Sequence, residues 1–284
     1  MSMWGRMISC APIVNRRCTR ANTRPSAGIQ PARRIASCPT RDWLIVLFAV
    51  VAQAAAQAPP RAPQTPRAAA PFDIAGNWVS VVTEDWRWRM LTPKKGDYAS
   101  VPLNAEGRKV ADTWDPSKAA SDGCKAYGGA AIMRVPGRLQ IAWENDSTLK
   151  IETDAGLQIR LLRFDKSQTP PAGRTWQGHS VAEWERIPQP GGTGVSLQQG
   201  AGRVGALKVI TTNLRAGYHR TNGAPYSENA RVTEYIDRQS AYGTDWLTVL
   251  TVVEDPRYLD QPFITSSHFK REPDRSKWTP KRCE

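Results

Sequence analysis

Histidine and cysteine are too scarce in this sequence to form the common metal sites. The 284 residues include three histidines, His179, His219 and His268, and none is spaced as H-x-x-x-H or H-E-x-x-H. The five cysteines contain no C-x-x-C pair. Zinc sites usually use such pairs, and the D-x-D-x-D-G loop typical of calcium sites is missing as well. We therefore expect neither a metal ion nor another cofactor.

Familiar catalytic motifs are also lacking. No G-x-S-x-G is present, and the G-x-G-x-x-G formed by Gly200, Gly202 and Gly205 belongs to the Gly-rich segment 191–205. A dinucleotide fingerprint follows a strand and opens a helix, whereas this segment follows Pro and Gly residues and precedes a predicted strand. The segment is therefore predicted to be a loop. No reaction is indicated, and whether the protein is an enzyme stays open.

The apolar run 43–56, W-L-I-V-L-F-A-V-V-A-Q-A-A-A, is too short to span a bilayer comfortably. Its length and the small residues that end it are typical of a signal-peptide h-region. We expect residues 1–58 to be a leader containing this signal peptide, 59–71 an extended, exposed Pro/Ala linker, and 72–284 a single β domain. The protein is thus predicted to be periplasmic or secreted, without a stable membrane span after processing.

The basic charge belongs partly to the leader. Residues 1–42 contain eight arginines and one aspartate; without them 31 basic and 25 acidic residues remain, and the formal charge falls from +13 to +6. The remaining basic residues are interleaved with acids, and no nucleic-acid-binding module is evident. We expect no nucleic-acid partner.

From Phe72 onward, short β-branched and aromatic runs alternate with Gly, Pro, Asn and Asp, as in antiparallel sandwiches and barrels. One helix is predicted between Leu103 and Trp114, with Asn104 as its N-cap. The predicted strands are 76–83, 130–135, 138–143, 147–153, 157–164, 177–185, 206–213, 229–238, 246–253 and 262–269.

Several motifs in the second half of the chain occur in a distinctive order. They are C-K-A-Y-G-G-A-A-I-M-R-V-P (124–136), G-H-S-V-A-E-W-E (178–185), L-K-V-I-T-T-N (207–213), N-G-A-P-Y-S-E-N-A-R-V-T-E-Y (222–235) and T-V-V-E-D-P-R-Y-L-D-Q-P-F (251–263). In order and spacing they resemble a large, uncharacterised family of secreted bacterial proteins. Many members have His where Tyr226 stands. The resemblance implies export, but it brings no established reaction.

The segment D-I-A-G-N-W (73–78) is similar to the G-x-W that opens the first strand of lipocalins. This resemblance implies that Trp78 closes one barrel end, packed under Lys270 or Arg271 of the last strand. An ordinary core tryptophan is the alternative interpretation of Trp78. The predicted fold class is mainly β, an antiparallel lipocalin-like (calycin-like) barrel with one short helix.

Strand alternation leaves the environment of His179 open. His179, Val181 and Glu183 share one face of their strand, and Ala182 and Trp184 share the other. If Trp184 marks the core, His179 is solvated. If the other face is inside, His179 lies in a pocket.

The strand 229–238 places Glu234 on its more apolar face, between Val232 and Ile236. A carboxylate on an inner face must be paired or protonated, because burying an isolated charge is costly. A Tyr, an Arg or His179 could be its partner. A structural network and a ligand-binding or catalytic acid are both compatible with this pattern.

Export would leave an even number of cysteines. Three of the five precede the apolar run, so only Cys124 and Cys283 remain in the mature chain. Thiols in an oxidising compartment tend to pair. We predict a disulfide that fixes the polar tail 272–284.

The leading hypothesis is binding of a small, largely apolar molecule in the barrel mouth. Two alternatives remain: a hydrolase or isomerase with His179 and Glu234 as an acid–base pair, and a structural protein of the cell envelope. The expected ligand-binding residues are Trp184, Tyr226, Tyr235, Glu234 and His179.

Overall fold

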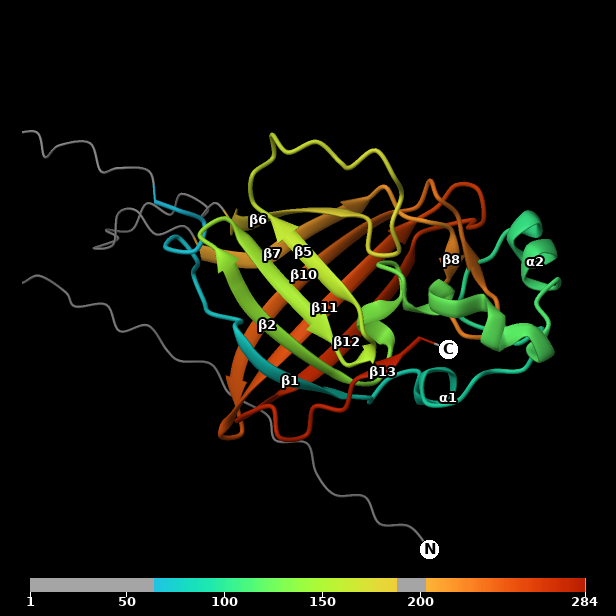
Figure 1. Cartoon of the computed structure of the whole chain (residues 1–284), viewed down its shortest axis with the longest axis horizontal. Helices are drawn as coiled ribbons and strands as arrows, with labels where there is room; N and C mark the ends of the chain where they lie inside the picture. The colour runs from blue at the N-terminus through green and yellow to red at the C-terminus, as the bar shows by residue number, and fades with distance from the viewer. Residues whose placement is uncertain (1–63, 188–202, 284) are drawn as a thin grey trace, which may run out of the picture. The chain divides into compact units, whose positions relative to one another are not determined.

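Nine strands wrap into a closed barrel in this computed structural model, which describes residues 64–187 and 203–283. These residues all belong to the unit Pro59–Glu284. The leader, the first part of the linker and most of the Gly-rich segment 191–205 lie outside the described residues. Figure 1 shows the barrel with its labelled strands.

The barrel order is β1-β12-β11-β10-β7-β6-β5-β3-β2, and β2 pairs with β1 to close the ring. Neighbours are antiparallel except β5 and β6, which run parallel. The fold is thus mainly β, as predicted. The strands are β1 Gly76–Val81, β2 Arg138–Asn145, β3 Thr148–Thr153, β5 Ile159–Arg163, β6 His179–Ile187, β7 Arg203–Thr212, β10 Arg231–Ala241, β11 Thr244–Glu254 and β12 Phe263–Glu272.

One strand prediction was wrong. The segment 130–135 contains the 3₁₀ helix η2, Ile132–Arg134, instead of a strand. All five residues from Ala130 to Arg134 are buried, so their apolar run could not distinguish a strand from a helical turn.

Helices and small strands extend from one end of the barrel (Figure 1). The predicted helix is present as α2, Ala105–Ala111, and Asn104 caps it by accepting a hydrogen bond from the Gly107 N–H at 2.8 Å. The other elements at this end were not predicted: α1 Trp86–Arg89, η1 Pro116–Tyr127, and the strand pairs β8 Gly217–Tyr218 with β9 Pro225–Tyr226 and β4 Ala155–Gly156 with β13 Lys281–Arg282.

The barrel interior is filled by a cluster of apolar side chains, most of them from inward positions of the strands. In β10 these positions are Val232, Glu234 and Ile236, each at most 1% exposed. Alternation along a strand therefore identified the inner face correctly. A second cluster, which includes Leu103, Tyr226 and Phe263, lies between the barrel and the added elements.

Trp78 is fully buried, and its Nε1 donates to the Ile74 carbonyl at 3.0 Å. The Arg271 guanidinium lies 5.4 Å from the centroid of its ring. Arg271 also donates to the Ala75 carbonyl at 3.0 Å and pairs with Asp245 at 3.4 Å. This arrangement matches the lipocalin-like closure of a barrel end, with Arg271 in place of the alternative Lys270.

The chain before β1 also contacts the barrel. Residues 66–69 form a turn, and the Pro66 carbonyl accepts a hydrogen bond from Trp184 Nε1 at 3.0 Å. The last part of the expected linker is therefore folded onto the domain instead of extended.

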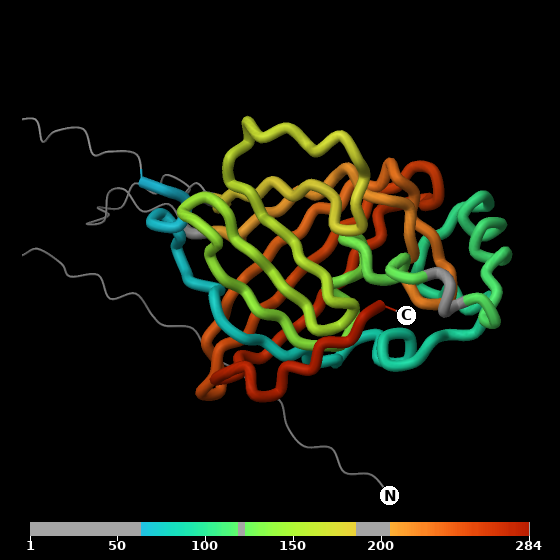
Figure 2. Tube along the Cα trace, viewed as in Figure 1, coloured from blue at the N-terminus to red at the C-terminus, as the bar shows by residue number. Residues whose placement is uncertain are grey.

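The predicted disulfide between Cys124 and Cys283 is present, with 5.1 Å between the two Cα atoms. It joins η1 to the last described residue of the chain. Figure 2 shows the tail returning beside the barrel before it reaches η1.

Candidate functional site

Three nearly buried arginines lie together at the barrel end that carries the helices. The exposed fraction is 2% for the Arg89 side chain, 6% for Arg134 and 4% for Arg220. With His219 they border a cavity of about 60 Å³. We call this site the arginine pocket; its other lining residues are Trp88, Ala126, Ala131, Val135, Pro136 and Thr221.

Three separate segments supply the arginines and the histidine of the arginine pocket. Arg89 ends α1, Arg134 ends η2, and His219 and Arg220 follow β8 directly. The turn after Arg220 requires Gly223, which has a φ of +82° and whose added Cβ would lie 2.4 Å from Trp114. The fold thus brings together residues that are far apart in the sequence.

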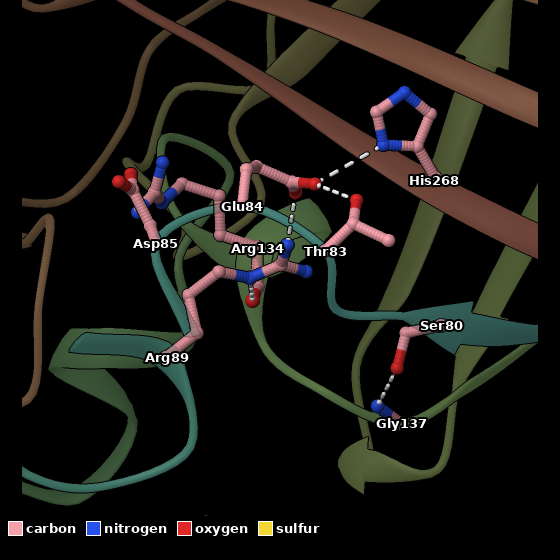
Figure 3. A network of polar contacts seen from close by, with 8 residues as sticks. All are labelled: Ser80, Thr83, Glu84, Asp85, Arg89, Arg134, Gly137 and His268. Atoms are coloured by element: carbon pink, nitrogen blue, oxygen red, sulfur yellow. Dashed lines mark hydrogen bonds and ion pairs between the residues drawn. The ribbon is translucent and has the colours of Figure 1, made fainter. Parts of the chain in front are cut away.

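Two carboxylates neutralise two of the arginines (Figure 3). Arg89 pairs with Glu84 and donates to the Arg134 carbonyl at 2.8 Å, while Arg134 pairs with Asp85 at 2.9 Å. Glu84 also accepts from the Thr83 hydroxyl at 2.6 Å. Burial opposes ionisation of Glu84, but the Thr83 hydrogen bond and the Arg89 charge keep its pKa below the ordinary value.

Arg220 differs from the other two because all three of its guanidinium nitrogens are buried without a hydrogen-bond partner among the described residues. One further nitrogen in each of Arg89 and Arg134 is in the same state. Burial, reinforced by the charge of Arg134, lowers the pKa of Arg220 to about 10. Arg220 therefore remains charged at neutral pH, and the pocket presents several unused donors.

Trp88 forms the aromatic wall behind Arg220. The Arg220 guanidinium lies 4.7 Å from the centroid of the Trp88 ring, a distance at which a cation is attracted to the ring face. Trp88 Nε1 donates to Asp97 at 3.1 Å, and Asp97 pairs with Arg87 at 2.8 Å. The stack orients Arg220 without neutralising it.

His219 adds an uncharged donor to the arginine pocket. Complete burial, with the charges of Arg134 and Arg220, lowers its pKa to about 3. Its ring packs between Tyr226 and Phe263, at centroid distances of 5.5 and 5.3 Å. Neither ring nitrogen has a hydrogen-bond partner among the described residues, so a neutral imidazole offers one donor and one acceptor there.

Glu234 lies inside the barrel and is paired with Arg160 of β5. The two guanidinium–carboxylate distances are 3.0 and 2.5 Å, and both residues are at most 1% exposed. Thr211 accepts a further bond from Arg160 at 3.4 Å and shares a 2.7 Å bond with Ser180. Glu234 is thus a member of a buried structural network, with an arginine as its partner.

His179 lies on the other side of the barrel wall. Ser180 and Ala182 face inward, so alternation points His179 outward. His179 is nevertheless only 4% exposed, so neither alternative holds as stated: the face opposite His179 is the inner one, yet His179 is not solvated. The segment 164–178 arches outside the barrel (Figure 2). Burial and the Arg163 charge lower the pKa of His179.

The other expected ligand-binding residues are dispersed. Trp184 packs against Phe72 and Phe164, at centroid distances of 5.2 and 5.7 Å. Tyr235 faces outward, with Lys208 Nζ 6.0 Å from its ring centroid. Only Tyr226 approaches the arginine pocket, through His219, and burial raises the pKa of its hydroxyl. The five residues do not share one pocket.

Sequence reasoning missed the arginine pocket almost completely. It named His219 only when counting histidines, and it placed Arg134 in a strand that does not exist. The one available signal was the adjacent pair His219–Arg220, two residues before the turn at Asn222–Gly223. Its partners Arg89 and Arg134 are identified only by the fold.

No metal-ligating cluster and no helix long and apolar enough to cross a membrane occurs among the described residues. Comparison with protein-family models, with curated proteins and with solved structures finds no match to this chain. The geometry of the site therefore carries the functional argument by itself.

Proposed function

We propose that this protein binds the anionic group of a small ligand in the arginine pocket. The observation that carries the proposal is Arg220, a charged side chain that is 4% exposed and lacks a hydrogen-bond partner among the described residues. Burial of an unpaired charge is costly, and a bound anion would offset that cost. A guanidinium also matches planar oxyanions better than an ammonium does.

The other hypotheses have less support. An apolar ligand inside the barrel would compete with the core cluster that includes Trp78, Leu207 and Phe269. An enzyme using His179 and Glu234 would need both groups in one cleft, whereas they lie on opposite faces of the wall. A purely structural envelope protein would have no need for an unpaired Arg220.

Export is part of the proposal. The apolar run 43–56 and the Cys124–Cys283 disulfide both support a periplasmic or secreted protein, because structural disulfides persist in oxidising compartments. N-terminal sequencing of protein recovered from the periplasm or medium should find a start between residues 53 and 60. A start before Trp43 would contradict cleavage of a signal peptide.

Thermal melts of the wild type and Arg220→Met test anion binding directly. Propionate, sulfate and phosphate are each titrated, with NaCl added to keep the ionic strength constant. At least one of them should raise the wild-type melting temperature saturably, because a ligand that binds only the folded state stabilises it. Arg220→Met should lose this response. In NaCl alone, the same variant should gain about 1–3 kcal/mol of stability, because it removes an unpaired buried charge.

Arg215→Met is the matched control. Arg215 is exposed and also stacks on a tryptophan, 4.4 Å from the centroid of Trp176. The Arg215→Met variant should keep the wild-type response to anions. If no anion produces a stabilisation that depends on Arg220, the proposal is wrong.

A further inference from the structure

We infer that the ligand of the arginine pocket is a small organic monocarboxylate. This inference rests on the proposed function and specifies its chemistry. Three observations lead to it: the balance of buried charge, the apolar lining and the size of the cavity.

The balance of charge in the arginine pocket leaves one positive charge. Arg89, Arg134 and Arg220 contribute three cations, and Glu84 and Asp85 neutralise two. The nearby Arg87–Asp97 pair is balanced within itself. One anionic charge completes the site, whereas a dianion would leave an excess negative charge in a place with little water. The site thus favours a monovalent anion.

The lining favours an anion attached to carbon. Trp88, Ala126, Ala131, Val135 and Pro136 present apolar surface next to the guanidinium groups. Inorganic phosphate or sulfate exposes oxygen on every side, and its outer oxygens would lose their water against such a wall. A carboxylate places two oxygens toward the arginines and a hydrocarbon body toward the apolar residues.

The cavity is small. Its volume is about 60 Å³, so only a ligand with a few non-hydrogen atoms can enter it. A carboxylate with a short apolar body is therefore the expected ligand. Its coplanar oxygens can accept paired hydrogen bonds from a guanidinium such as that of Arg220, and neutral His219 can donate one more without changing the charge balance.

Isothermal titration with three probes tests this inference at pH 7.5 and constant ionic strength: propionate, its uncharged analogue propionamide, and sulfate. We expect propionate to bind at least about tenfold more tightly than sulfate, and propionamide to show no saturable binding. Arg220→Met should weaken propionate binding by about tenfold or more, and Arg215→Met should leave it unchanged.

The failures of the two proposals are distinguishable. If sulfate or phosphate binds as tightly as propionate and depends on Arg220, the monocarboxylate inference is wrong but anion binding stands. If propionamide binds as well as propionate, the charge has no role and both proposals fail. If no anion shows a response that depends on Arg220, both also fail.

A substitution tests the charge balance itself. Glu84→Gln removes one of the two internal carboxylates while nearly preserving the side-chain volume, so the pocket would carry two uncompensated charges. Sulfate binding should then improve relative to propionate by about tenfold. Asp85→Asn removes the carboxylate that pairs with Arg134, and it replaces Glu84→Gln in this test if the Glu84→Gln variant does not fold. An unchanged ratio in a folded variant would refute charge as the basis of selectivity.

Discussion

Arg160 and Arg220 are both almost fully buried, yet only Arg160 has a carboxylate to pair with. Arg160 lies within the barrel wall, opposite Glu234, and its charge is cancelled by a bidentate contact. Arg220 lies beside a cavity and has only partial compensation from Asp85 and Asp97 at longer range. The first arrangement stabilises a core, and the second leaves a charge available to a ligand.

The protein should lose less stability when Arg160 and Glu234 are both replaced than when only one of them is replaced. Glu234→Leu leaves Arg160 uncompensated and should lower the free energy of unfolding by about 3–5 kcal/mol, whereas Glu234→Gln, which keeps a hydrogen-bond acceptor, should cost less. The double variant Arg160→Met/Glu234→Leu should recover much of the loss. Urea denaturation measures each value. Additive losses in the double variant would mean that the two groups do not form an energetic pair.

His219 should make stability depend on pH. Its pKa is about 3 in the folded protein against an ordinary value of 6.5. Between these values the unfolded chain binds more protons, so stability falls as the pH drops, by up to about 1.4 kcal/mol per pH unit. Above pH 6.5 the group makes no such contribution.

Urea denaturation of the wild type and His219→Gln at pH 7.5, 5.5 and 4.5 isolates this effect. Gln has no titrating group, so the variant should lose less stability than the wild type on acidification. Parallel pH profiles for the two proteins would contradict the assignment.

The sequence identified the inward position of Glu234 because strand alternation is local information. It left the partner open among a tyrosine, an arginine and His179, since Arg160 lies 74 residues away and is brought close only by barrel closure. The arginine pocket was hidden for the same reason. Its charges lie on α1, on η2 and after β8, and none of these segments has a pattern that indicates a site.

At the scale of elements, the barrel strands and helix α2 were predictable, and the other added elements were not. In a strand with one solvent-exposed face, such as β10, apolar and polar residues alternate. This alternation indicates both that the segment is a strand and which of its faces is buried. The segment around η2 is buried on all sides and shows no period. The parallel pairing of β5 and β6 also escaped prediction, because it depends on the path of the connection 164–178.

Close packing between the end of η1 and β9 gives a prediction at this scale. A Cβ added at Gly128 would lie 1.9 Å from the Tyr226 hydroxyl oxygen and 3.1 Å from the Trp176 carbonyl. Gly128→Ala should therefore lower the free energy of unfolding by about 2–4 kcal/mol, because the added methyl group overpacks this contact. Tyr226→Phe alone should cost little, because the hydroxyl has no hydrogen-bond partner among the described residues.

In the Tyr226→Phe background, Gly128→Ala should cost less, since the nearest clashing atom is gone. Urea denaturation of the two single variants and the double variant gives the coupling energy. A Gly128→Ala penalty that is the same in both backgrounds would show that the Tyr226 hydroxyl is not the obstacle.

At the scale of the whole molecule, the disulfide ties the end of the chain to the elements around the arginine pocket. Cys124 lies in η1, two residues before the pocket residue Ala126, and Cys283 lies next to β13, which pairs with β4. Without the bridge, the end of the polar tail would be held mainly by the short β4–β13 pairing. Loss of the bridge should therefore affect both global stability and the pocket.

The double variant Cys124→Ser/Cys283→Ser measures both effects. The bridge spans a sequence separation of 159 residues, and for a loop of this length the chain-entropy model gives a stabilisation on the order of 5 kcal/mol as an upper value. We expect a clear fall in the free energy of unfolding in urea, and weaker propionate binding because η1 loses its anchor near Ala126.

Cys10, Cys18 and Cys38 precede the proposed cleavage site, so the mature wild type should contain no free thiol in an alkylation assay under non-reducing conditions. Two alkylated thiols in the folded, exported protein would show that the bridge does not form, and unchanged stability in the double variant would show that it does not stabilise the fold.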